Sequence, residues 1–255
     1  MSLRAPEIPA IKRFIFICLS SLLAACTQPS TQDTVTVAVA ANFKIALDSL
    51  ETDFEARTDY KLEAVVGSTG KLYAQITYGA PYDVFLAADQ ARPIRLVEKD
   101  LAAAQSRFTY AFGRLVLWGT DDPAALATSD VKRIAIANPE LAPYGKAAKQ
   151  AISELNLTEA TAPKLVLGEN VGQAFAFVST GNAQVGFVSE AQIISLGETE
   201  AGLSWRPSAD LHDPIAQDAV LLKRAANKAA AIAFMDYLGT EPARDIIAQN
   251  GYDLP

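Results

Sequence analysis

The sequence predicts an α/β protein with two lobes and a ligand cleft between them. Strand-like and helix-like segments alternate from Val35 onward, and the same alternation begins again after Arg114. A later strand-like run, residues 219–222, precedes two closing helical segments. Alternating strands and helices are typical of a parallel sheet covered by helices. A chain that builds one such lobe, leaves for a second and then returns forms a cleft where ligands bind.

The first lobe is expected to begin with residues 35–113. Its first helix is indicated by a helical apolar stripe, in which Phe43, Leu47, Leu50 and Phe54 recur at steps of four, three and four. Strands are expected at residues 35–40, 61–66 and 83–88, and helices at residues 43–54, 71–78 and from 89 onward. The third of these strands is a nearly continuous apolar run, which is typical of a buried parallel strand.

The second lobe is expected to cover residues 114–215, and residues 216–255 are expected to return to the first lobe. In the second lobe, strands are expected at residues 115–118, 133–137, 165–167 and 185–189, with helices at residues 145–155 and one that ends at residue 180. In the return segment, the strand at residues 219–222 precedes helices at residues 227–238 and 242–250. The chain would therefore cross between the lobes twice.

Residues 1–25 have the pattern of a lipoprotein signal peptide. Lys12 and Arg13 precede an apolar stretch at residues 14–23, and the small residues before Cys26 form a lipobox. The apolar stretch is much shorter than the roughly 20 residues that span a bilayer, which disfavours a transmembrane anchor. We expect cleavage before Cys26, lipid on its sulfur and a polar tether at residues 26–34; a plain secretory signal is the main alternative.

Charge and composition exclude several classes of function. The chain has a formal net charge of −7, and removal of the expected signal peptide would make it more negative. An acidic chain without a Lys/Arg cluster is not suited to nucleic acids or anionic membrane surfaces. Cys18 would leave with the signal peptide and Cys26 would carry lipid, so neither a disulfide nor a thiolate metal site is expected. With His212 as the single histidine, a His-ligated metal site or a Ser–His triad is not expected.

Three short loops between strands and helices are the candidate ligand site. They are residues 41–43 (ANF), 67–70 (GSTG) and 143–145 (PYG), and none contains Lys, Arg or His. The N-terminus of a helix presents unpaired N–H donors and the positive end of the helix dipole, so it favours anions. Several such loops without a basic residue suit an oxyanion that is bound and then released. This pattern indicates a binding protein rather than an enzyme.

Five motifs resemble the molybdate-binding proteins of bacterial molybdate ABC importers, and they occur in the order found in that family. They are VAVAANF at residues 37–43, GSTGKLYAQI at 67–76, GAPYDVFLAAD at 79–89, NPELAPYG at 138–145 and ENVGQA at 169–174. The third motif is the most distinctive, and the resemblance covers roughly residues 35–255. It implies the class II type of two-lobed periplasmic binding protein fold, with two chain crossovers. It also implies a monomer without a cofactor.

The resemblance further implies a ligand and its contacts. The ligand would be molybdate, with tungstate as a second candidate, bound as an oxyanion whose metal no side chain coordinates directly. The family's contact positions correspond to Ala41, Asn42, Ser68, Thr69, Tyr144 and Val171, the last through its backbone N–H. Many relatives have a hydroxyl residue at the position of Ala41, which offers only its backbone N–H. The protein would be a lipid-anchored periplasmic receptor that delivers the ligand to an inner-membrane ABC permease.

The chemistry of the loops favours a fully deprotonated anion. Molybdate near neutral pH needs only hydrogen-bond donors, whereas phosphate retains a proton and needs an acceptor as well. The three loops contain neither Asp nor Glu, so phosphate would leave a donor unmatched. A receptor for another small oxyanion such as sulfate stays open as the alternative. The signal peptide counts against the effector domain of a transcription factor, and the lack of a nucleophile–base pair counts against a hydrolase.

Several of these positions also have a plain structural interpretation. Asn42 is a favoured helix N-cap type, and Gly, Ser and Thr at residues 67–70 are ordinary turn residues. Val171 is a packing residue by type, and only its motif nominates it. Tyr144 is expected on an exposed loop at the cleft, with its hydroxyl free to donate.

Overall fold

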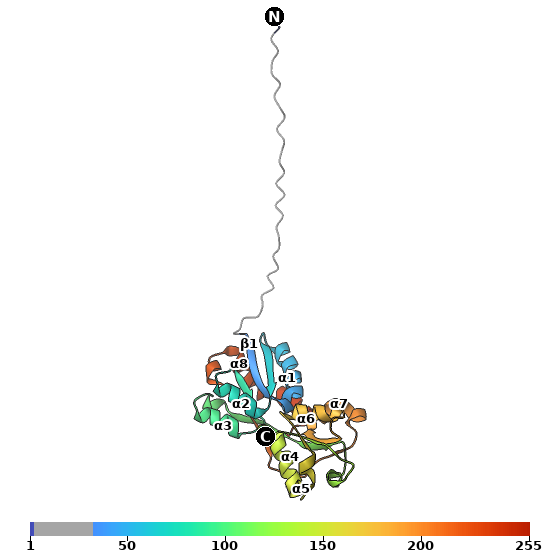
Figure 1. The fold of residues 1–255 in the computed structure, drawn as a ribbon. Helices are drawn as coiled ribbons and strands as arrows, with labels where there is room; N and C mark the ends of the chain where they lie inside the picture. The colour runs from blue at the N-terminus through green and yellow to red at the C-terminus, as the bar shows by residue number, and fades with distance from the viewer. Residues whose placement is uncertain (3–32) are drawn as a thin grey trace.

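The computed structural model describes residues 1–2 and 33–255, so all but the first two residues of the predicted signal peptide, Cys26 and most of the predicted tether lie outside the described residues. Residues 33–255 form two α/β lobes, each built on a five-stranded sheet (Figure 1). This architecture confirms the predicted fold class. No helix of the described residues is long and apolar enough to cross a membrane.

The first lobe has the strand order β2-β1-β3-β10-β4. The strands β1, β2 and β3 are parallel, and β10 runs antiparallel to both β3 and β4. The strands are β1 (Thr34–Ala40), β2 (Lys61–Gly67), β3 (Val84–Leu86), β4 (Phe108–Gly113) and β10 (Ile215–Leu221). The helices are α1 (Lys44–Arg57), α2 (Thr69–Thr77), α3 (Ala91–Glu98), α8 (Ala229–Leu238) and α9 (Glu241–Gln249).

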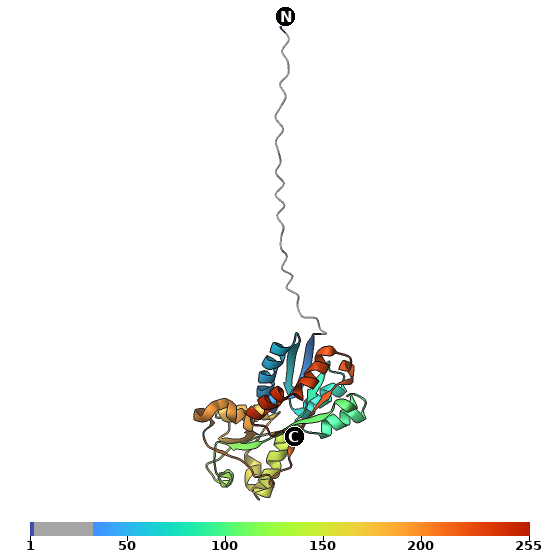
Figure 2. The same ribbon diagram turned by 180° about the vertical axis from the view of Figure 1, so that it is seen from behind.

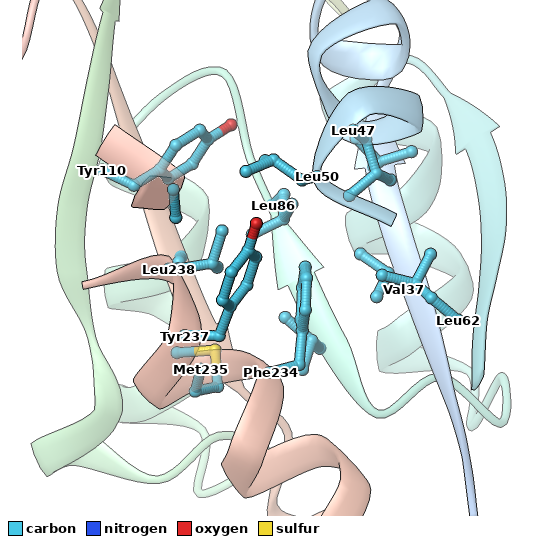
Figure 3. Packing of buried hydrophobic residues seen from close by; sticks show 14 of the residues in the cluster. Val37, Leu47, Leu50, Leu62, Leu86, Tyr110, Phe234, Met235, Tyr237 and Leu238 are labelled. Atoms are coloured by element: carbon cyan, nitrogen blue, oxygen red, sulfur yellow. The ribbon is translucent and has the colours of Figure 1, made fainter. Parts of the chain in front are cut away.

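The two faces of this sheet bury separate cores. Because successive strand residues point to opposite faces, Val37 lies in the core beneath α1 and α8, whereas Ala38 packs on the side of α2 and α3. Figure 3 shows Leu47 of α1 and Phe234 and Leu238 of α8 converging over the first face. The predicted apolar stripe of α1 is buried in this core.

The second lobe has the strand order β7-β6-β8-β5-β9. Strand β6 runs parallel to β7 and β8, and β5 runs antiparallel to β8 and β9. The strands are β5 (Leu115–Trp118), β6 (Ile134–Ala137), β7 (Leu165–Gly168), β8 (Val185–Ser189) and β9 (Ser204–Trp205). The helices are α4 (Pro143–Glu154), α5 (Thr158–Thr161), α6 (Val171–Ser179) and α7 (Glu190–Ala201).

Two segments, residues 113–115 and 206–214, connect the lobes, and we call them the hinge. The first joins β4 to β5, and the second joins β9 to β10. The C-terminal end of the chain pairs with β4 just before the first segment, because Phe112 and Asp253 exchange backbone hydrogen bonds of 2.8 and 3.0 Å. Seen from behind, the red C-terminal helices lie against the blue N-terminal part of the chain (Figure 2). The last part of the chain therefore completes the first lobe.

The structure differs from the sequence-based expectation in two respects. The strands β4 and β9 and the helices α5 and α7 were not predicted, and both sheets are mixed rather than parallel. Helix α7 begins with a capping box. The Ser189 side chain accepts from the backbone N–H of Gln192, and the Gln192 side chain accepts from the backbone N–H of Ser189. The residues of this box could have predicted the start of α7, but Ser189 is also the last residue of β8.

Candidate functional site

The three loops nominated from the sequence meet at one small cavity between the lobes. We call it the interlobe cavity; its volume is about 10 Å³, room for roughly one water-sized sphere. All six predicted contact residues line it, and the full lining is Ala40, Ala41, Asn42, Gly67, Ser68, Thr69, Ala88, Ala142, Pro143, Tyr144, Asn170 and Val171. Most of these residues follow the carboxyl ends of strands, where open α/β sheets bind ligands.

Asn42 lies in a 3₁₀ turn, Ala41–Phe43, between β1 and α1. Its side chain does not cap a helix, so the plain N-cap interpretation is wrong. Instead Asn42 Nδ2 donates to Gln217 Oε1 at 2.8 Å and to Tyr252 Oη at 3.3 Å. Because both interactions turn this amide nitrogen toward the protein, the donors that the turn offers to the cavity are backbone N–H groups.

Ser68 and Thr69 supply hydroxyl groups from the start of α2. Ser68 is the N-cap, and its Oγ accepts from the backbone N–H of Lys71 at 3.4 Å. Thr69 Oγ1 accepts from the backbone N–H of Ala88 at 3.1 Å. An oxygen that accepts in this way keeps its own hydrogen for another partner. Both side chains are buried, so both hydroxyl groups can donate into the cavity.

Tyr144 supplies a third hydroxyl group, from the second lobe. It is the second residue of α4, after Pro143 at the first helical position, and its side chain is only 2% exposed. The expectation of an exposed loop tyrosine is therefore wrong, because α4 begins two residues earlier than predicted and its first turn packs into the second core. Its hydroxyl group is buried without a hydrogen-bond partner.

Val171 completes the cavity at the first residue of α6. Its side chain is 3% exposed and packs in the second core. The preceding Asn170 caps the helix, accepting from the backbone N–H of Gln173 at 3.0 Å. The N–H groups of the first helical turn have no intrahelical acceptor, so a backbone role for Val171 is compatible with this geometry.

The interlobe cavity is lined by uncharged residues, several of which can donate hydrogen bonds. None of its lining residues is charged, and the starts of α2, α4 and α6 present helix N-termini that favour negative charge. Burial raises the pKa of the Tyr144 hydroxyl group well above its usual value, so this group stays protonated and can donate. Among the residues that the structure describes, no three His, Cys, Asp or Glu side chains gather as metal ligands would.

The lobes touch one another over the cavity. The backbone N–H of Gly70 donates to Leu141 O at 2.8 Å, and Lys71 Nζ lies 2.9 Å from the carboxylate of Glu169. Arg92 Nη2 donates to the carbonyl oxygen of Glu140 at 3.0 Å. Arg92 therefore bridges the two lobes. These contacts hold the structure in a closed arrangement.

Sequence reasoning missed a buried polar group behind the cavity. It comprises Gln217, Tyr110 and Tyr252, which all bond to Asn42 or to one another. They lie far from Asn42 in the chain, on β10, β4 and the C-terminal end. No local pattern marks them, because their roles arise from contacts between distant segments.

Comparison with known proteins identifies the family. The family model described as bacterial extracellular solute-binding protein matches residues 35–253. The molybdate-binding protein ModA of Azotobacter vinelandii is 43% identical over 246 residues, which cover 94% of this chain and 97% of that protein. The protein of the same name from Rhodobacter capsulatus is 44% identical over 229 residues, which cover 88% of this chain and 90% of that protein.

A solved structure agrees with the sequence comparison. The periplasmic molybdate-binding protein of Azotobacter vinelandii has a TM-score of 0.82 with this chain at 39% identity, covering 87% of this chain and 99% of that chain. These relatives are binding proteins rather than enzymes. The chain therefore belongs to the bacterial extracellular solute-binding proteins and, within them, to the family of the molybdate-binding protein ModA.

Proposed function

We propose that this chain is the periplasmic substrate-binding component of a molybdate ABC importer. It captures molybdate in the interlobe cavity and delivers it to an inner-membrane permease. One observation carries the proposal: hydrogen-bond donors from both lobes surround a cavity without any charged lining residue. The buried hydroxyl group of Tyr144, which lacks a protein partner, supports it further. The similarity to molybdate-binding proteins over most of the chain supports the choice of ligand.

The donors suit a fully deprotonated tetrahedral dianion. The hydroxyl groups of Ser68, Thr69 and Tyr144 and the backbone N–H groups of Ala41, Asn42 and Val171 are the proposed contacts. Molybdate can accept from all of them, whereas protonated phosphate would bring a donor with no acceptor to meet it. Fixed dipoles in a closed, dry site act at low effective dielectric, so they can hold a dianion without a basic residue.

Ligand entry requires the lobes to separate. The interlobe cavity holds roughly one water-sized sphere, which is too little for an oxyanion of five heavy atoms. The contacts of Gly70 with Leu141 and of Lys71 with Glu169 would open and re-form over the bound anion. Closure of this kind buries the ligand, and its release to a permease needs only the reverse movement.

Tungstate has the same charge and shape as molybdate, and we include it as a second ligand. Sulfate is also a fully deprotonated tetrahedral dianion, so the same donors could serve it. Selection of molybdate over sulfate rests on the size of the site in its ligand-bound form. A sulfate receptor is therefore the alternative that the first experiment addresses.

Calorimetric titration and thermal unfolding of residues 27–255 are expected to show tight binding of molybdate and tungstate, weak binding of sulfate and no binding of phosphate. A ligand at 100 times its Kd stabilises the folded state by about 2.7 kcal/mol. For a chain of this size the melting temperature would rise by roughly 5–10 °C. Equal heats for sulfate and molybdate would reject selection by size. No binding of any oxyanion would reject the proposed function.

We also propose that lipid on Cys26 anchors the protein to a membrane of the cell envelope. The lipobox at residues 23–26 supports this proposal, and the polar tether would keep the folded lobes near the membrane. A Cys26→Ser variant is expected to leave the membrane fraction and to bind molybdate as the lipidated protein does. Cell fractionation followed by titration measures both properties. If the variant stays with the membrane, the apolar segment itself is the anchor.

A further inference from the structure

Gln217 lies behind the interlobe cavity, on the strand that returns the chain to the first lobe. It is completely buried. Its Nε2 and the Tyr144 hydroxyl group are the two buried side-chain atoms without a hydrogen-bond partner among the residues that the structure describes. A Cβ atom built on Gly113 would lie 2.6 Å from that Nε2 and 2.2 Å from Tyr144 Oη, so both atoms adjoin the same glycine. Buried polar groups are nearly always paired, so this pair needs an explanation.

The orientation of the Gln217 amide follows from Tyr252. The Tyr252 hydroxyl group has one hydrogen, which it donates to the backbone oxygen of Asn42 at 2.6 Å. Its oxygen can therefore only accept from the Asn42 side chain, 3.3 Å away, so the amide nitrogen of Asn42 must face it. The same nitrogen lies 2.8 Å from the amide of Gln217, and Gln217 must therefore present its oxygen to Asn42.

Tyr110 strengthens this orientation. Its hydroxyl group lies 3.1 Å from Gln217 Oε1, nearer than the backbone oxygen of Ala87 at 3.3 Å, and its single hydrogen can be donated to Gln217. Tyr110 is the extra residue of a β-bulge, because Gln217 pairs with Ala111 and Asp218 pairs with Thr109. Bulges often redirect side chains beside functional sites. With its oxygen held between Asn42 and Tyr110, the amide of Gln217 has its nitrogen directed elsewhere.

The nitrogen of Gln217 therefore lies on the side of Tyr144 Oη, because both atoms adjoin Gly113, although no hydrogen bond joins them in this structure. Burial raises the pKa of the Tyr144 hydroxyl group, and the neighbouring amide of Gln217 acts in the opposite direction. An amide N–H can only donate, so Tyr144 Oη can meet this group only as an acceptor. The hydrogen of the Tyr144 hydroxyl group is then left to point at the interlobe cavity, which this residue lines.

We propose that Gln217 is a positioning residue that sets the direction of the Tyr144 hydroxyl group, so that its hydrogen points at the bound oxyanion. This inference rests on the proposed function and extends it to a residue that does not line the cavity. Gln217 belongs to the first lobe and Tyr144 to the second. Closure of the lobes therefore brings the amide to the phenol and completes the donor set.

Two substitutions separate this role from simple packing. Gln217→Leu removes both polar atoms, whereas Gln217→Glu keeps an acceptor for Asn42 and Tyr110 and replaces the donor that faces Tyr144. An ionised carboxylate would draw the Tyr144 hydrogen away from the cavity. Gln75→Leu and Gln75→Glu are matched controls, because Gln75 accepts a hydrogen bond of 2.9 Å from a buried tyrosine, Tyr82, which does not line the cavity as Tyr144 does.

Titration with molybdate is expected to show that Gln217→Leu raises the Kd roughly 10-fold or more, as loss of a hydrogen bond to a charged group does. In a Tyr144→Phe background the same substitution should change the Kd little, because the group through which it acts is already absent. The Gln75 variants should bind as the unsubstituted chain does. Additive losses for Gln217→Leu and Tyr144→Phe would overturn the inference.

The affinity of the Gln217→Glu variant for molybdate is expected to depend on pH. Burial raises the pKa of a carboxyl group, and a protonated Glu regains an O–H donor for Tyr144. The Kd of this variant should therefore fall as the pH is lowered, unlike that of Gln217→Leu. The titratable groups around the position are Tyr110, Tyr144 and Tyr252, whose pKa values burial raises, and Asp218, which pairs with Arg107.

The two proposals fail separately. If the unsubstituted chain binds no oxyanion, the proposed function is rejected. If it binds molybdate and both Gln217 variants bind molybdate as tightly as the unsubstituted chain does, the positioning role alone is rejected. A loss of affinity that is the same in Gln217→Glu and Gln217→Leu at every pH would also overturn it. Should Gln217→Leu fail to fold, the pH profile of Gln217→Glu decides.

Discussion

Gly145→Ala is expected to lower the free energy of unfolding by about 3 kcal/mol, at the upper end of the usual range for overpacking. A Cβ atom at Gly145 would lie 2.1 Å from the carbonyl oxygen of Ala137 and 2.7 Å from its carbonyl carbon. These are backbone atoms at the end of β6, so no side chain can turn away to relieve the contact. The helix α4 would have to move off the sheet, and with it the adjacent Tyr144.

The sign of this effect opposes that of helix propensity. Alanine stabilises a helix interior by about 1 kcal/mol relative to glycine, so propensity alone would predict a more stable variant. Thermal unfolding should instead show a melting temperature lower by roughly 6–12 °C, and titration should show weaker binding of molybdate. Gly239→Ala is the control, because its Cβ atom would meet only Asp236 O, at 3.4 Å. An unchanged melting temperature for Gly145→Ala would show that α4 can shift without loss of stability, contrary to this prediction.

The sequence was sufficient for the elements that define the fold, because their signals are local. The apolar stripe from Phe43 to Phe54 predicted α1, and the alternation of strands and helices predicted two α/β lobes. It also predicted where the three loops lie, since the carboxyl ends of parallel strands meet at one edge of a sheet. All six nominated residues line the interlobe cavity for that reason. Their role as ligand contacts stays a prediction.

Other features depend on contacts between distant parts of the chain. The antiparallel direction of β10 is set by its pairing with β3 and β4, and no local pattern gives a strand its direction. Gln217 is separated from Asn42 by 175 positions and Tyr252 by 210. The burial of Tyr144 has the same origin, because it depends on how α4 packs in the second lobe. Local sequence therefore predicted which residues reach the cavity, but not what orients them.

Tyr144→Phe is expected to weaken molybdate binding while leaving the ligand-free protein at least as stable. The lost interaction is a hydrogen bond to a charged group, which contributes about 1.5–3 kcal/mol, or roughly 10- to 150-fold in Kd. Within the closed protein the hydroxyl group is buried without a partner among the described residues. A buried unpaired polar group destabilises the folded state by about 1–3 kcal/mol, so its removal should raise the melting temperature.

The control for this prediction is Tyr82→Phe, which removes the same hydroxyl group from another buried tyrosine. Tyr82 is 8% exposed, and its hydroxyl group donates to Gln75 Oε1 at 2.9 Å. Because that hydrogen bond is satisfied within the protein, its loss should lower stability by about 1 kcal/mol and leave the Kd unchanged. The two substitutions are therefore expected to have opposite effects on the melting temperature, and only Tyr144→Phe should weaken binding of molybdate.

Opposite effects of this kind distinguish a ligand contact from a residue of the scaffold. A hydroxyl group that stabilises only the ligand-bound state is maintained at the expense of the empty state, which is the expected behaviour of a preorganised binding site. If Tyr144→Phe binds molybdate as the unsubstituted chain does and melts at a lower temperature, its hydroxyl group stabilises the fold instead. In that case Tyr144 is not a ligand contact, and the anion must be held by the backbone N–H groups and the hydroxyl groups of Ser68 and Thr69.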